Sequence, residues 1–194
     1  MEPRIIALYS QAPGMGKSTV ASRLVLRHGY VRMSFADPIK ALLTELMAYY
    51  DIHPDTAYDY LYGAKKEQVV PELGLSGRRM MQSLGVEWGR YHIGFDVWVN
   101  ALLKQIEVLP PHKKVVIDDL RFANEYKALQ KIGAEFWQVH RDGVELSHSH
   151  QSDGLLNSIK FDVIINNNWG REDLDYTVDA VLRKKQNATK AGAI

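Results

Sequence analysis

The sequence predicts an α/β fold with three layers, in which a parallel five-stranded sheet lies between helices. Short β-branched, apolar runs alternate with segments of helical periodicity along the 194 residues, which is typical of a parallel sheet covered on both faces. The run VVID at 115–118 is apolar until its final carboxylate, as expected for a central strand. A glycine-containing turn also separates the first strand from the first helix. We expect a single domain, since single domains commonly reach this size.

The first elements are a strand, a helix and a second strand. RIIALYS at 4–10 predicts a buried strand, and a helix follows from about Lys17. Gly29 stands where a helix C-terminus favours a left-handed residue, and residues 30–36 predict the second strand. Asp37, followed by proline, predicts the N-cap of the next helix.

The middle of the chain predicts a helical excursion from the core. The periodicity loosens between 51 and 76, where prolines and glycines recur. Arg78 to Trp88 then predicts a helix ended by Gly89, and Asp96 predicts the cap of another.

The last part of the chain returns to the alternation of strand and helix. A helix at 124–132 precedes strands at 134–140 and 161–165, and a last helix starts at about 172. We therefore expect one domain with a core at 1–36 and 112–190, a helical insertion at about 37–100 and a lid-like loop at about 141–155.

Composition limits the partners of the protein. Lys and Arg number 24 against 23 Asp and Glu, so the chain lacks the basic surplus of proteins that grip long nucleic acids. A few local basic groups are enough for a small anionic ligand. Cysteine is absent, which excludes disulfides and thiol nucleophiles. We find neither a signal-peptide pattern nor an apolar run of about 20 residues, and expect a cytoplasmic protein with no membrane contact.

The strongest motif is SQAPGMGKST at 10–19, between the first strand and the first helix. Its end matches G-x-x-x-x-G-K-[ST], whose backbone N–H groups cradle phosphates at a helix N-terminus. Lys17 is expected to reach the β- and γ-phosphates of ATP, and the Ser18 hydroxyl to bind Mg²⁺. Gln11 replaces the first glycine, which puts the entry to the loop in question. The competing interpretation is a chance glycine-rich turn. The expected ATP-binding residues are Gly14, Met15, Gly16, Lys17, Ser18 and Thr19.

A second motif is VVIDDLRF at 115–122. A carboxylate at the end of a strand beside a phosphate loop can hold Mg²⁺ through its water shell. Asp119 or Asp118 is suited to this, and Arg121 would face the phosphates. The alternative is a solvated pair of carboxylates with an ordinary salt bridge.

A third motif is SGRRMMQSLGVEWGRYHIG at 76–94. Arginine forks grip phosphate, and an amide beside an aromatic ring can recognise a base edge. On residue types alone, an amphipathic surface helix is an equal alternative. The residues of interest are Arg78, Arg79, Gln82, Glu87, Trp88 and Arg90.

The fourth motif is a polar loop that starts at Arg141. A lid that carries an arginine would exclude water and stabilise transition-state charge. His148, His150 and Asp153 suggest a metal site, but an H-x-H pair in a polar loop is more often a solvated loop.

Several of these segments resemble the deoxynucleoside monophosphate kinases of bacteriophages. The resemblance is carried by SFADP, LG-x-EWGR, FDVWVNAL and D-x-RF-x-NE, and it runs from the phosphate loop to about residue 168. It implies an adenylate-kinase-like P-loop kinase fold with ATP and Mg²⁺ as donor and a deoxynucleoside monophosphate (dNMP) as acceptor. Gln11 and Val86 depart from the pattern, where glycine and threonine are expected.

The resemblance also implies roles for individual residues. Lys17, Asp119, Arg121 and Arg141 would be catalytic, and Ser18 and Asp119 would hold Mg²⁺, with Asp119 acting through water. The remaining residues would surround the acceptor nucleotide: Ser34, Asp37, Arg79, Gln82, Glu87, Trp88 and Arg90.

The expected reaction is transfer of the γ-phosphoryl group of ATP to a dNMP. The alternatives are a P-loop kinase for another metabolite, such as phosphomevalonate or a sugar acid, and a DNA-end kinase, which the near-neutral charge disfavours. A GTPase switch lacks its N-K-x-D motif, for which NNNW at 166–169 is a poor substitute. The accepted bases and the oligomeric state, including a homodimer, are left open.

Overall fold

The structure is a computed structural model that describes residues 2–144, 156 and 159–191. The chain divides into two compact units. Unit 1 comprises residues 1–34 and 106–194, and unit 2 comprises residues 35–105. The expected boundaries of a single domain stay a prediction. In the part of the chain that is described, no helix is long and apolar enough to cross a membrane.

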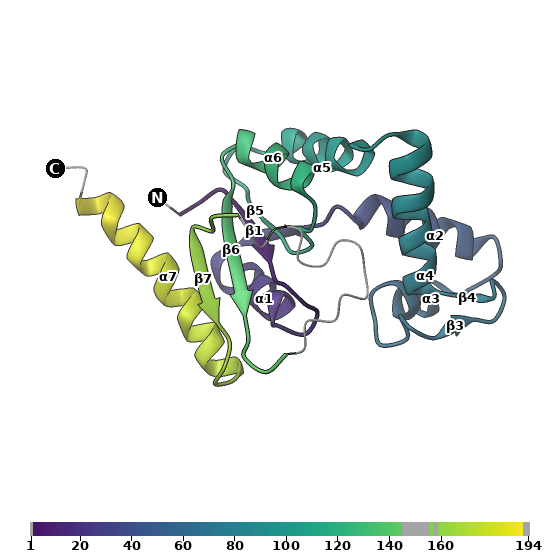
Figure 1. Ribbon diagram of the computed structural model, residues 1–194, viewed down its shortest axis with the longest axis horizontal. Helices are drawn as coiled ribbons and strands as arrows, with labels where there is room; N and C mark the ends of the chain where they lie inside the picture. Colours follow the sequence, from purple (N-terminus) through teal and green to yellow (C-terminus); the bar gives the residue numbers. More distant parts are fainter. Residues whose placement is uncertain (1, 145–155, 157–158, 192–194) are drawn as a thin grey trace. The chain divides into compact units, whose positions relative to one another are not determined.

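Unit 1 is built on a parallel five-stranded sheet in the order β2-β5-β1-β6-β7 (Figure 1). Its strands are β1 (Ile5–Tyr9), β2 (Tyr30–Met33), β5 (Lys114–Ile117), β6 (Glu135–His140) and β7 (Val163–Asn166). Strand β1 is central, and all five of its side chains are buried because helices cover both faces. The predicted α/β fold with a parallel five-stranded sheet is confirmed.

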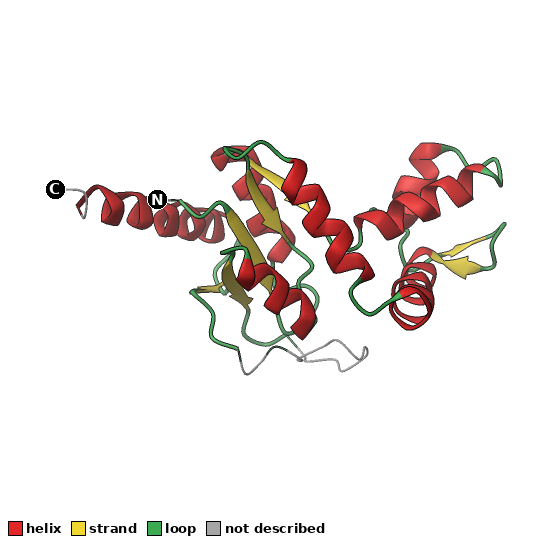
Figure 2. Ribbon diagram, turned by 90° about the horizontal axis from the view of Figure 1, so that it is seen from above, coloured by secondary structure: helices red, strands yellow, loops and turns green. Residues whose placement is uncertain are grey.

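Helices flank this sheet on both sides (Figure 2). They are α1 (Lys17–His28), α6 (Ala123–Lys131) and α7 (Arg171–Ala191). Helices α1 and α7 share a core cluster with Ile6 and Leu8 of β1. Helix α6 contacts the opposite face, where the Tyr126 ring lies 4.2 Å from that of Phe136, measured between centroids. Alternate side chains of the strands therefore pack against helices on opposite faces of the sheet.

Unit 2 is helical apart from one small hairpin. Its elements are α2 (Asp37–Ala48), α3 (Pro54–Leu61), β3 (Val69–Val70), β4 (Leu75–Ser76), α4 (Gly77–Gln82) and the π-helix η1 (Ser83–Ile93). Helix α5 (Val97–Val108) starts in unit 2 and continues into unit 1. The core of unit 2 gathers Ile39, Met47, Leu61, Met80 and Trp98. The hairpin was not expected from the sequence.

Two local predictions are wrong. The N-cap of α2 is Ala36, so Asp37 lies in the first turn, where its carboxylate is 3.8 Å from the Lys40 ammonium. The helix that starts near Arg78 does not end at Gly89 but widens into η1 and continues to Ile93. The widening accompanies a hydrogen bond of 2.7 Å from the Trp98 indole N–H to the carbonyl of Gly85.

Candidate functional site

The phosphate loop follows central strand β1 and ends in the first turn of α1. Gly14 and Gly16 adopt left-handed backbone conformations, with φ of 80° and 106°. Gln11 is not among the residues with positive φ. The loop therefore requires glycine at its later positions and not at its first, which answers the question raised by Gln11. Gly16 is the N-cap of α1 and brings no side chain that would cover the first N–H groups of that helix.

Lys17 is held along the loop by a serine that the sequence did not single out. The Lys17 ammonium donates a hydrogen bond to the Ser10 hydroxyl, which in turn donates to the Ala12 carbonyl over 2.7 Å. Ser10 is buried. Ser18 is exposed, and its hydroxyl has no hydrogen-bond partner within the described part of the chain. Lys17 is thus oriented by the loop, while the Ser18 hydroxyl faces solvent.

The two carboxylates after β5 have different partners. Asp118 is buried and forms an ion pair with Arg32 of the neighbouring strand β2. Asp119 accepts a hydrogen bond of 2.6 Å from the Ser34 hydroxyl. Strands β1, β2 and β5 are parallel neighbours, so the loop, Ser34 and the two carboxylates all follow strand ends at the same edge of the sheet. Ser34, expected beside the acceptor, is bonded to Asp119 here.

Arg121 is presented by a turn that Glu125 fixes. The buried Glu125 carboxylate accepts hydrogen bonds from the backbone N–H groups of Arg121, at 2.8 Å, and Phe122, at 3.0 Å. This closes the N-terminus of α6 and explains the glutamate of the D-x-RF-x-NE motif. The Arg121 guanidinium makes no ion pair or hydrogen bond to any residue that the structure describes. It is therefore a free cation at the edge that carries the phosphate loop.

Apart from Ser34, which belongs to unit 1, the expected acceptor-binding residues lie in unit 2. Arg79, Gln82, Glu87, Trp88 and Arg90 share the continuous helix formed by α4 and η1, and Asp37 starts α2. The Arg79 guanidinium is 3.0 Å from the Glu87 carboxylate. The Ser83 hydroxyl, 2.6 Å from the Glu87 carboxylate, and the positive charge of Arg79 lower the pKa of Glu87. Glu87 therefore stays ionised and holds Arg79.

The expected acceptor-binding residues differ in their exposure to solvent. Trp88 is 45% exposed, and Arg79 and Glu87 are also exposed. Arg90 is buried, donates to the Phe95 carbonyl over 3.2 Å and lies against the Phe95 ring. Arg90 thus stabilises the turn between η1 and α5 in this structure. Its expected contact with a nucleotide stays a prediction.

Arg141 follows β6 and is exposed. Its side chain has no polar partner among the residues described. From residue 145 the expected lid lies outside the described residues, as do His148, His150 and Asp153. Elsewhere in the described chain, no group of three or more His, Asp or Glu side chains is placed to hold a metal ion.

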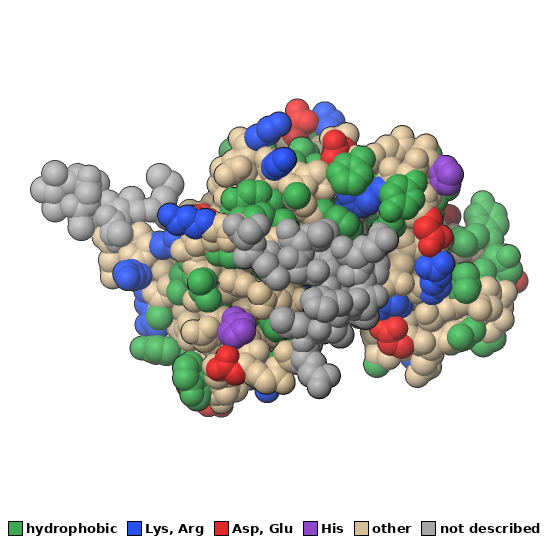
Figure 3. Space-filling view, in the orientation of Figure 1, with side chains coloured by type: hydrophobic (Ala, Val, Ile, Leu, Met, Phe, Trp, Pro, Cys, Tyr) green, Lys and Arg blue, Asp and Glu red, His purple; other side chains and the backbone are tan. Residues whose placement is uncertain are grey.

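Charged side chains of both signs lie on the described surface, and several converge at one edge of unit 1. Lys and Arg side chains are interspersed with Asp and Glu over the described surface of the face in Figure 3. The edge of unit 1 combines phosphate-cradling glycines, the Lys17 ammonium, the Arg121 guanidinium and the Asp119 carboxylate. Such a set can bind a polyphosphate with its cation and neutralise charge that develops during transfer.

Comparison with known proteins identifies the family. The family model for deoxynucleotide monophosphate kinases matches residues 61–178. A protein of Acanthamoeba polyphaga mimivirus, provisionally named a deoxynucleotide monophosphate kinase, is 30% identical over 173 residues, which cover 80% of this chain and 84% of the relative.

A solved structure shares the fold. The crystal structure of TT1252 from Thermus thermophilus covers 95% of this chain and 98% of its own, with a TM-score of 0.51 and 17% identity. That likeness concerns the fold alone. The family model and the viral relative confirm the family membership that the SFADP and LG-x-EWGR segments implied. The chain belongs to the deoxynucleotide monophosphate kinase family and is a nucleotide phosphotransferase.

Proposed function

We propose that the protein transfers the γ-phosphoryl group of ATP to a dNMP and releases ADP and a dNDP. The observation that carries this proposal is the phosphate loop, with left-handed Gly14 and Gly16, an uncovered helix N-terminus and an oriented Lys17. A loop of this geometry binds the phosphates of a nucleoside triphosphate. The family then supplies the acceptor class.

Phosphoryl transfer to this acceptor does not require a strong general base. An acceptor phosphate oxygen is already anionic at neutral pH; it attacks the γ-phosphorus as the bond to the β–γ bridging oxygen breaks. Lys17 would neutralise charge on the transferred group. Arg121 and Arg141, whose guanidinium groups make no polar contact with the described residues, are suited to the same task. A magnesium ion held by Ser18 and Asp119 would supply further positive charge against the phosphate oxygens.

The Ser18 hydroxyl and Asp119 are the groups we propose for magnesium. Ser18 has no polar partner among the described residues, and serine at this position of the loop binds the cation in related folds. Asp118 is neutralised by Arg32, which favours Asp119 of the two carboxylates. The Ser34 hydroxyl donates a hydrogen bond to the Asp119 carboxylate and helps to orient it.

For the acceptor, we propose the α4–η1 helix of unit 2. Gln82 makes no side-chain hydrogen bond to the described residues, and Trp88 offers a half-exposed indole ring. An amide can read a base edge and an aromatic ring can stack on a base. Arg79, held by Glu87, would meet the acceptor phosphate. The accepted base and a cytoplasmic location stay predictions.

A coupled ADP-release assay tests the proposal. With Mg·ATP, we expect turnover with at least one of dAMP, dGMP, dCMP, dTMP and modified pyrimidine nucleotides, and none with phosphomevalonate or sugar acids. Lys17→Ala should lower turnover by about 100-fold or more with thermal unfolding unchanged, because it removes charge stabilisation from a surface loop. Inactivity on every nucleotide, or full activity of the lysine variant, would contradict the proposal.

A further inference from the structure

The segment Asn166-Asn167-Asn168-Trp169 begins at the last residue of β7 and has no part in the transfer described above. We infer that Asn167 is a positioning residue for the phosphate loop. Its amide sets the orientation of the Met15–Gly16 peptide and so the direction of one phosphate-binding N–H group. The inference rests on the proposed function, because the loop must bind the phosphates of ATP.

Asn167 bridges two elements that are far apart in the sequence. Its backbone N–H donates to the carbonyl of His140, at the end of β6, over 2.7 Å. Its side-chain N–H donates to the carbonyl of Met15 over 3.0 Å. Met15 is buried, so its peptide is shielded from competing water. The loop is therefore fastened to the strand beside it.

The hydrogen bond to the Met15 carbonyl also fixes the direction of the Gly16 N–H, because both groups belong to one peptide. In a planar trans peptide, the carbonyl of one residue and the N–H of the next point in opposite directions. Because the Met15 carbonyl is directed at Asn167, the Gly16 N–H points to the opposite side. Without the amide, that peptide can rotate, since two left-handed glycines flank Met15.

Gly16 packs directly on the same amide. A Cβ added to Gly16 would lie 2.5 Å from the Asn167 side-chain nitrogen and 3.4 Å from a methyl carbon of Leu174. The glycine is thus required both by its φ of 106° and by the close approach of Asn167. Asn167 therefore packs closely against Gly16 of the loop and also donates a hydrogen bond to Met15.

Neighbouring bonds hold Asn167 in place. The Asn168 side chain accepts from the Asp142 backbone N–H over 2.9 Å and donates to the Asp142 carboxylate over 2.6 Å. That carboxylate also lies 2.9 Å from the His140 ring nitrogen. The segment after β7 is therefore tied to the end of β6 on both sides of Arg141, and Asn167 is presented from a fixed backbone.

Isothermal titration of ADP into wild type, Asn167→Ala and Asn167→Asp tests the role. We expect about 5- to 10-fold weaker binding for the alanine variant, the range expected for the loss of one partly buried hydrogen bond. The aspartate variant should bind more weakly still, because a carboxylate would face the Met15 carbonyl and repel phosphate. Asn166→Ala is the control, since the exposed Asn166 side chain makes no hydrogen bond to the described residues.

Kinetics and unfolding separate positioning from general stabilisation. For Asn167→Ala we expect a higher KM for ATP, a KM for the acceptor within about twofold of wild type, and a Tm close to that of Asn166→Ala. Wild-type ADP affinity in both Asn167 variants, or equal rises in both KM values, would overturn the inference while the proposed function stands. Failure of the wild-type protein to bind ADP would overturn the proposed function and this inference together.

Discussion

At the scale of single residues, the phosphate loop was predictable because its chemistry is local. Gly14, Gly16, Lys17 and Ser18 follow one another in the chain, so their spacing alone indicates a phosphate cradle. The partners that orient them were not predictable. Ser10 acts through hydrogen bonds within the loop segment, and Asn167 acts through a contact that only the folded sheet creates. The phosphate-loop motif indicates neither contact.

The loop geometry predicts opposite outcomes for substitutions at Gln11, where the motif has its first glycine, and at Gly16, its last glycine. Gln11→Gly should leave the KM for ATP within about twofold, since the Gln11 backbone does not need positive φ. Gly16→Ala should abolish measurable ATP binding, because alanine is strained at φ of 106° and its Cβ would collide with Asn167. Titration of ADP into both variants provides the measurement. A large gain in affinity for Gln11→Gly would show that the first position is strained after all.

At the scale of elements, the strands of the parallel sheet and their order along the chain were predictable, and the helix with the acceptor residues was only partly so. Buried strands are apolar runs between turn residues, which sequence reveals directly. The extension of α4 through η1 depends on packing instead. A Cβ on Gly89 would lie 2.4 Å from the Trp98 ring, and a Cβ on Gly85 would lie 3.0 Å from the Ile39 side chain. Gly89 suggested the end of a helix, whereas in the structure it lies inside η1 and marks a close contact with Trp98.

This packing predicts a large effect for one glycine and a small one for its neighbour. A Cβ on Gly89 would lie 2.4 Å from the Trp98 ring, which cannot withdraw because its indole N–H is bonded to Gly85. Gly89→Ala should therefore lower the free energy of unfolding by about 2 kcal/mol. Gly94→Ala meets no atom within 4 Å and should change it by less than about 0.5 kcal/mol. Urea denaturation of both variants measures the difference, and equal midpoints would refute the packing account.

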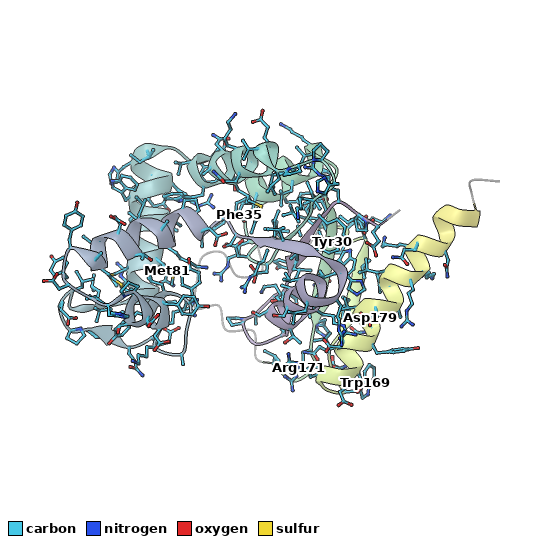
Figure 4. The ribbon with its side chains drawn as sticks, turned by 180° about the vertical axis from the view of Figure 1, so that it is seen from behind. Tyr30, Phe35, Met81, Trp169, Arg171 and Asp179 are labelled. Atoms are coloured by element: carbon cyan, nitrogen blue, oxygen red, sulfur yellow. The ribbon has the colours of Figure 1, made fainter. Side chains whose placement is uncertain are left out.

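At the scale of the whole molecule, the sheet and its helical layers were predictable, and the sequence also predicted a helical insertion at about 37–100. Composition does not change at the boundary near residue 35, so the sequence offers no linker signal. Ion pairs and hydrogen bonds between segments far apart in the sequence could not be predicted either. Asp179 of α7 lies toward α1 (Figure 4), where its carboxylate binds Arg23 over 2.5 and 3.0 Å and lies 2.8 Å from the His28 ring.

This tie predicts a pH-dependent contribution to the stability of unit 1. Hydrogen bonds from Arg23, and then from His28, hold the pKa of Asp179 well below its usual range. A carboxyl group with a lowered folded-state pKa stabilises the protein above its unfolded pKa of about 3.9 and loses this contribution as the pH falls below it. Asp179→Asn should therefore lower the free energy of unfolding at pH 7 by about 1 kcal/mol, a value reduced for partial exposure.

Thermal unfolding at pH 7, 5 and 3 checks this prediction. The difference in Tm between wild type and Asp179→Asn should be constant at pH 7 and 5 and shrink at pH 3. Asp175→Asn serves as the matched control, because its carboxylate lies 3.7 Å from Arg23 and should contribute less. A difference that widens with falling pH would contradict the role assigned to Asp179.

The central claim is that the phosphate loop donates the γ-phosphoryl group of ATP to a dNMP. The most direct measurement is to incubate the protein with γ-labelled ATP, magnesium and each dNMP, and to separate the products. We predict that the label appears in a dNDP in equal amount to the ADP formed, and that Lys17→Ala abolishes this transfer. Label found only in inorganic phosphate, or retained in ATP with every acceptor, would contradict the claim.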